Sequence, residues 1–126
     1  MYTLPKTKKL LKSREFQTVL NSRVKFVLPE VVIFSKPNKL GTSRMGLVVT
    51  KKIGNAVTRN KIKRQLREVF RQSSCQKNSN RHDLDLVFIA RAKSKSTSYE
   101  KLSESFEFAL GHIEKRYKRN QETKHR

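Results

Sequence analysis

A strand followed directly by a cationic, amphipathic helix lies in the middle of the chain and limits how it can fold. Residues 45–50 include an apolar run on both faces, which is typical of an interior strand covered by helices. Gly54 and Asn55 break this strand, and residues 56–72 then repeat apolar side chains at helical spacing. A crossover of this length can return the chain to the same end of a sheet, so we expect the helix to join two parallel strands.

Other segments show the periodicity of helices and strands. Residues 13–20 predict a short helix, and residues 24–28 and 31–34 predict two strands. Residues 83–91 are the clearest strand, and a helix is expected from Tyr99 to about Tyr117.

These elements follow one another in the order α-β-β-β-α-β-α, and they predict an α+β fold, an α/β sandwich. The sheet is expected to be small and mostly antiparallel, with one parallel pair joined by the basic crossover helix. Residues 1–117 are predicted to form a single domain, and residues 118–126 a basic, disordered tail.

The charge of the chain points to a polyanionic partner. The sequence has 30 Lys and Arg against 10 Asp and Glu, a formal charge of +20 on 126 residues. Such self-repulsion is tolerable mainly when a polyanion neutralises it, so we expect the domain to bind RNA. A solvated charged face is the simpler alternative for any one basic helix. Here Glu68 is the lone acid of residues 56–72, so salt bridges along the helix do not explain its charge.

The residue types disfavour catalysis by the protein itself. His82, His112 and His125 lack metal-ligand spacing, and no nucleophile-and-base arrangement is visible. Asp83 and Asp85 lie on one face of a strand start, where they could bind Mg²⁺ or, more simply, act as a local counter-charge.

The location expected from the sequence is the cytoplasm. No stretch is long and apolar enough to span a bilayer, and the first residues lack the apolar core of a secretory signal. Cys75 is the only cysteine, which excludes an intrachain disulfide and a thiolate metal cluster.

Three phenylalanines in the first third of the chain could stack on nucleobases. Phe16, Phe26 and Phe34 are each more simply core residues. A groove between the first helix and the sheet could nonetheless hold a single strand through exposed rings.

The residues also resemble a known family. Residues 45–64 are similar to the signature of the bacterial ribonuclease P protein subunit, a strand followed by K-x-x-G-x-A-V-x-R-N-x-x-x-R. The pattern L-K-x-x-x-F ending at Phe16 and the strand at 86–91 extend the resemblance over nearly all of residues 8–115.

The resemblance implies a small subunit bound to a catalytic RNA, which together form an endoribonuclease that removes the 5′ leader from precursor tRNA. It implies Mg²⁺ bound mainly by the RNA, no catalytic residues or metal ligands in the protein, and neither DNA nor an obligatory protein as partner. The residues implied to contact the catalytic RNA are Arg59, Asn60, Lys61, Lys63, Arg64 and Arg67. Those implied for a cleft that holds the leader are Phe16, Phe34, Lys51, Lys52 and Asn55.

Two positions depart from the family pattern. Lys61 stands where the family has arginine, which removes a bidentate fork from the predicted RNA contact. Leu20 stands where the family often has another aromatic residue, which reduces stacking in the predicted cleft.

Two other classes of protein share some of these features. A ribosomal or other structural RNA-binding protein has a similar size and charge. A helix-turn-helix protein would read DNA with the basic helix, but it needs a short helix just upstream, where this sequence has a strand and Gly54.

Overall fold

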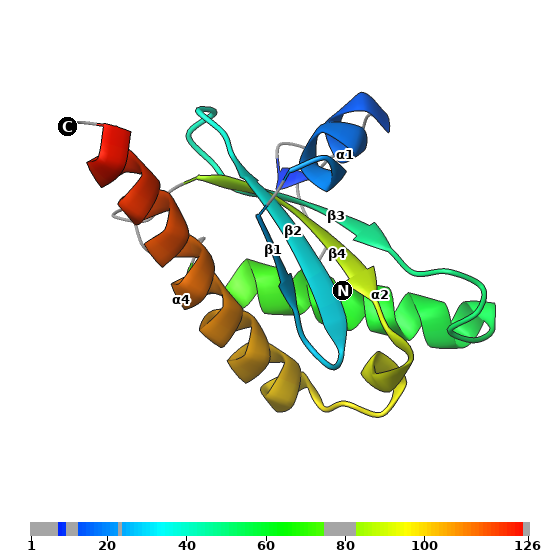
Figure 1. Cartoon of the computed structure of the whole chain (residues 1–126). Helices are drawn as coiled ribbons and strands as arrows, with labels where there is room; N and C mark the ends of the chain where they lie inside the picture. The colour runs from blue at the N-terminus through cyan, green and yellow to red at the C-terminus, as the bar shows by residue number, and fades with distance from the viewer. Residues whose placement is uncertain (1–7, 10–12, 23, 75–82, 125–126) are drawn as a thin grey trace.

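The chain forms a four-stranded mixed sheet with helices on both of its faces (Figure 1). The computed structural model describes residues 8–9, 13–22, 24–74 and 83–124. The order predicted from the sequence is confirmed, with one additional short 3₁₀ helix, η2. The elements are α1 (Ser13–Leu20), β1 (Val24–Val27), β2 (Val31–Pro37), β3 (Arg44–Val48), α2 (Ala56–Gln72), β4 (Leu84–Ala90), η2 (Ala92–Lys95) and α4 (Tyr99–Lys124).

The strands lie in the order β1-β2-β4-β3. β1 pairs with β2 and β2 with β4 in antiparallel fashion, whereas β3 and β4 are parallel. α2 joins these two parallel strands, so the predicted crossover is confirmed.

The expected interior position of β3 was wrong, because β3 lies at the edge of the sheet beyond β4. Its side chains are apolar on both faces because helices cover both faces there. Leu47 packs against the core on one side and Val48 against a second apolar cluster on the other. Lys9 forms an isolated parallel bridge with Met45 of this edge strand.

The main core lies between the sheet and the helices α2 and α4. Phe88 in the central strand β4 is fully buried, with its ring centroid 6.5 Å from that of Phe70 in α2 and 5.1 Å from that of Phe106 in α4. Burying a side chain of this size contributes about 1.5–3 kcal/mol. These contacts fix α2 against the sheet and leave its opposite side facing outward.

Two element boundaries differ from those expected by three residues or more. β2 continues to Pro37, past the predicted end at residue 34, because Ser35 points into the core and its Oγ lies 2.8 Å from the hydroxyl of Tyr117. α4 continues to Lys124, so the expected helix end near Tyr117 was too early. Apolar spacing stops at Tyr117, but the Lys, Arg, Gln and Glu that follow are good helix formers.

Within the described part of the chain, none of the helices has the length and apolarity needed to cross a lipid bilayer.

Candidate nucleic-acid interface

The start of α2 is fixed by a side-chain cap. Asn55 Oδ1 accepts a hydrogen bond from the backbone N–H of Thr58 at 2.9 Å, which satisfies one of the free donors of the first turn. Arg59 Nε donates to the carbonyl oxygen of Gly54 at 3.2 Å. Asn55 therefore has a defined structural role, and its predicted contact with a leader strand stays a prediction.

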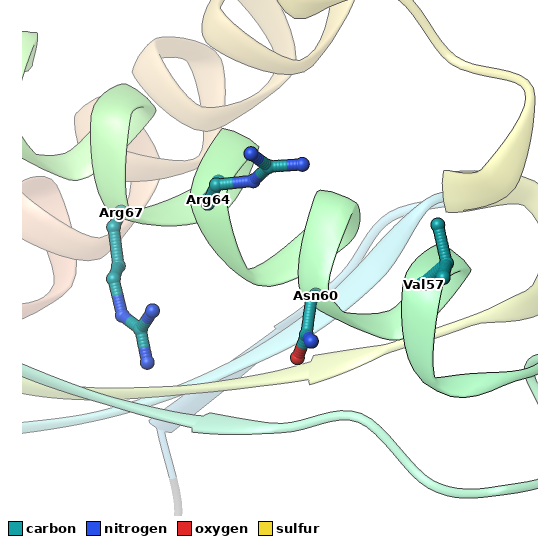
Figure 2. Close-up of a pocket in the computed structure, with 4 residues that line it drawn as sticks. All are labelled: Val57, Asn60, Arg64 and Arg67. Carbon is teal, nitrogen blue, oxygen red and sulfur yellow. The ribbon is translucent and has the colours of Figure 1, made fainter. Parts of the chain in front are cut away.

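The outer side of α2 carries most of the predicted RNA-binding residues. Ile62 and Leu66 face the core, so the side chains on the opposite arc of the helix face outward. A hollow lies along this arc of the helix, and Figure 2 shows the side chains around it. The residues that line it are Val57, Asn60, Arg64 and Arg67.

The cations of this outer side have no acidic neighbour in the described part of the chain. Among the described residues, no acid lies within ion-pairing distance of the four basic side chains Lys61, Lys63, Arg64 and Arg67. Glu68 pairs with Arg71 one turn further on, and this hydrogen bond lowers the pKa of Glu68. We call Asn60, Lys61, Lys63, Arg64 and Arg67 the α2 face.

A second surface lies on the opposite side of the sheet, where α1 packs. The strand register places four apolar side chains side by side across all four strands on this side. One of them is 55% exposed and the other three are half-buried, whereas Phe88 and Leu86 on the other sheet face are fully buried. We call these four residues the open strip: Val27, Val32, Ile89 and Val48.

α1 covers the next row of the same sheet face, and Val48 and Ile89 of the open strip also pack against the cluster formed by Val19 of α1 and Val87. The ring of Phe16 lies so close to Gly46 that a Cβ at position 46 would come within 2.6 Å of the ring atom Cε1. Phe34 occupies the same row, where Val87 pairs with both Gly46 and Phe34. The two predicted aromatic residues are thus brought to one face, and both rings are half-buried.

A chain of charged groups fixes α1 to the sheet. Arg44 Nη1 lies 2.7 Å from Glu15 Oε2 in α1, and Arg44 Nη2 lies 2.7 Å from Asp85 Oδ2 in β4. Asn38 Nδ2 also donates to Asp85, at 2.8 Å. The hydrogen bond to Asp85 raises the pKa of Arg44, so this side chain is permanently charged. Asp85 is therefore a counter-charge, the simpler of the two roles considered for it.

The basic residues predicted for the cleft lie around the open strip. Lys51 and Lys52 are exposed in the turn after β3, at the end of the strand nearest the open strip. Lys25 had not been predicted, and its Nζ lies 5.9 Å from the centroid of the Phe34 ring. The open strip had not been predicted either, and its signal in the sequence is that residues 31–34 and 86–90 are apolar at every position, which places apolar side chains on both faces of the sheet.

Of the other residues considered for metal binding, those that the structure describes form no metal site. The described residues contain no group of three or more His, Cys, Asp or Glu that could hold a metal ion. His112 is exposed and packs against the rings of Phe26 and Phe108. Residues Cys75, His82 and His125 lie outside the described part of the chain.

The helix-turn-helix alternative does not fit the arrangement of elements. The element directly before α2 is β3, and the two are joined by a turn at residues 49–55. A DNA-reading helix of that class would follow another helix.

Comparison with known proteins identifies similar sequences over most of the chain. A family model described as Ribonuclease P matches residues 4–114. The ribonuclease P protein component of Caldanaerobacter subterraneus subsp. tengcongensis is 40% identical over 106 residues, which cover 83% of this chain and 88% of that protein. The ribonuclease P protein component of Lachnoclostridium phytofermentans is 36% identical, with 86% of this chain and 88% of that protein covered.

Solved structures share the same fold. The RNase P protein of Staphylococcus aureus aligns with a TM-score of 0.70 and 31% identity, covering 82% of this chain and 93% of that one. The RNase P protein of Thermotoga maritima aligns with a TM-score of 0.67 and 28% identity, covering 86% of this chain and 96% of that one.

The close approach of the Phe16 ring to Gly46 leads to a prediction about a substitution at position 46. In the Gly46→Ala variant the added methyl group would displace the ring and loosen α1, so we expect the free energy of unfolding to fall by about 1–3 kcal/mol in a urea titration. The matched control is Gly111→Ala in α4, where a Cβ meets nothing within 4 Å. That variant should instead be more stable by roughly 0.5–1 kcal/mol, because alanine is the better helix former. A Gly46→Ala protein as stable as the parent would show that Phe16 is not held against Gly46.

Proposed function

This chain belongs to the ribonuclease P protein family, and from that premise we propose that its two surfaces bind two different RNAs. It is the protein component of a ribonucleoprotein endoribonuclease that processes the 5′ end of tRNA. In our proposal the α2 face binds the catalytic RNA, and the sheet face beside α1 binds the 5′ leader of precursor tRNA. The observation that carries the proposal is the α2 face, whose cations have no acidic partner among the described residues.

The α2 face suits the sugar-phosphate surface of a folded RNA. Arg64 and Arg67 can each donate two parallel hydrogen bonds to a phosphate, and the lysines add point charges. Lys61 provides charge without a fork, so it contributes attraction rather than a fixed geometry. Contacts of this kind fix position and orientation without reading the base sequence.

The sheet face suits a single strand. The open strip and the half-buried rings of Phe16 and Phe34 offer apolar area to unstacked bases, and base stacking on an aromatic ring is worth roughly 1–3 kcal/mol. Three lysines lie around this surface and can contact the phosphates of the bound strand: Lys25, Lys51 and Lys52. Because only the precursor has a leader, binding here favours the substrate over the mature product.

Mg²⁺ belongs to the RNA in this proposal. The described residues contain no group of three or more carboxylates or other ligands that could hold the ion. We propose that the groups that perform the cleavage are those of the RNA. The protein contributes cations that reduce the repulsion between two RNAs, which lowers the concentration of Mg²⁺ needed to bring them together. RNA is the only partner that this mechanism requires, and we propose that the complex acts in the cytoplasm.

A structural RNA-binding protein would share the α2 face but would be indifferent to a leader. The Phe34→Ala variant, reconstituted with the catalytic RNA, should bind precursor tRNA about tenfold more weakly and mature tRNA as tightly as the parent. Phe16→Ala should behave in the same way. The matched control is Phe108→Ala, which removes a 60% exposed ring on α4, away from the cleft. An equal loss of affinity for both tRNAs would remove the leader from the proposal.

The Mg²⁺ dependence of cleavage tests the contribution of the α2 face. Catalytic RNA and protein together should remove the leader at a low Mg²⁺ concentration at which neither acts alone. The double variant Arg64→Ala, Arg67→Ala should need severalfold more Mg²⁺ for the same rate, because fewer phosphates are neutralised. Arg116→Ala, which removes an exposed arginine from α4, serves as the control. A double variant with the Mg²⁺ requirement of the control would contradict this role of α2.

A further inference from the structure

The hollow on α2 contains an exposed apolar residue that phosphate binding does not explain. Val57 is 76% exposed, more than any other large apolar side chain among the described residues. It lies in the first turn of α2, and the three polar residues of the hollow follow it on the same arc of the helix (Figure 2).

Val57 contributes little to the fold. Its side chain belongs to neither apolar cluster of the described residues, in contrast to Ile62 and Leu66 on the inner side of the same helix. A β-branched residue is also a weaker helix former than alanine. An exposed apolar side chain of this kind contributes favourable free energy only when a partner removes it from water.

The polar residues of the hollow have unused hydrogen-bonding groups. Among the described residues, Asn60, Arg64 and Arg67 make no side-chain hydrogen bond to the protein. Asn55 and Arg59 nearby differ, since Asn55 caps the helix and Arg59 donates to Gly54. The hollow thus contains one amide group, which can both donate and accept hydrogen bonds, and two guanidinium groups beside one apolar side chain.

We propose that the hollow receives one unpaired nucleotide of the catalytic RNA, an inference that rests on the RNA-binding role of the α2 face. The face of the base lies against Val57, and the edge of the base hydrogen-bonds to the amide of Asn60. Arg64 and Arg67 hold the phosphates on either side of that nucleotide. Val57 is then a specificity residue, because it distinguishes an extruded base from the backbone of a helix.

The chemistry of RNA favours an unpaired nucleotide over a duplex. A paired, stacked helix presents phosphates, hydroxyl groups and base edges, but it hides the apolar faces of its bases. Arg64 and Arg67, which pair with none of the described acids, favour a polyanion over an apolar peptide, and the acid of α2, Glu68, is paired with Arg71. A nucleotide lifted out of its stack matches both the apolar and the cationic parts of the hollow.

Affinity for the catalytic RNA, measured over a range of salt concentrations, tests this inference. Val57→Ala and the nearly isosteric Val57→Thr should bind about tenfold more weakly than the parent, with the same dependence on salt, because no phosphate contact is lost. Arg64→Ala should bind more weakly with a salt slope lower by roughly 0.7–0.9, the change for one phosphate contact. Leu40→Ala, which truncates a 60% exposed leucine in the turn before β3, should match the parent.

Footprinting of the complexes with dimethyl sulfate identifies the nucleotide. An unpaired adenine or cytosine should be protected by the parent protein and reactive in the Val57→Ala complex. If both Val57 variants bind the catalytic RNA as tightly as the parent while Arg64→Ala binds more weakly, the nucleotide site is refuted and the proposed function is not. Full affinity of all three variants would refute the α2 face as well. A lower salt slope in the Val57 variants would also overturn the apolar contact.

Discussion

The burial of apolar side chains on both faces of β4 is the constraint on which the rest of the structure depends. Phe88 and Leu86 on one face and Val87 on the other are fully buried, so helices must cover both sides of the sheet. α2 and α4 cover the first face, whereas the short helix α1 covers only part of the second. The α2 face and the partly open sheet face are therefore direct consequences of how the core is closed.

α1 is held at one place on the sheet by two adjacent contacts of different kinds. Arg44 links Glu15 of α1 to Asp85 of β4, and the next residue, Phe16, rests on Gly46. An arginine with two carboxylate partners is costly to desolvate. It nevertheless fixes the relative position of those carboxylates, because its planar guanidinium group forms good hydrogen bonds in few arrangements. The position of α1 on the sheet thus depends in part on Arg44, Glu15 and Asp85, which need not touch RNA. Although the chain has a formal charge of +20 and only 10 acidic residues, two of these, Glu15 and Asp85, pair with Arg44 and hold α1 on the sheet.

The sequence alone predicted the parts that depend on local patterns. α2 was found with its full length and its cationic arc, because helical periodicity and the scarcity of acids are both visible in residues 56–72. The position of β3 was missed, since an edge strand covered by helices on both faces has the same pattern as an interior one. The open strip and the Arg44 ion pairs join residues far apart in the sequence, and they depend on a strand register that local patterns do not contain.

Cleavage of RNA by iron-EDTA tethered to the protein tests most directly whether two RNAs bind two surfaces. Single cysteines are introduced in a Cys75→Ser background, and each labelled protein is assembled with catalytic RNA and precursor tRNA. A tether at Lys61→Cys lies on the α2 face, and one at Val27→Cys lies on the open strip. We expect cuts in the catalytic RNA from the first tether and cuts in the 5′ leader from the second. Cuts in the same RNA strand from both tethers, or an uncut leader beside Val27→Cys, would contradict this expectation.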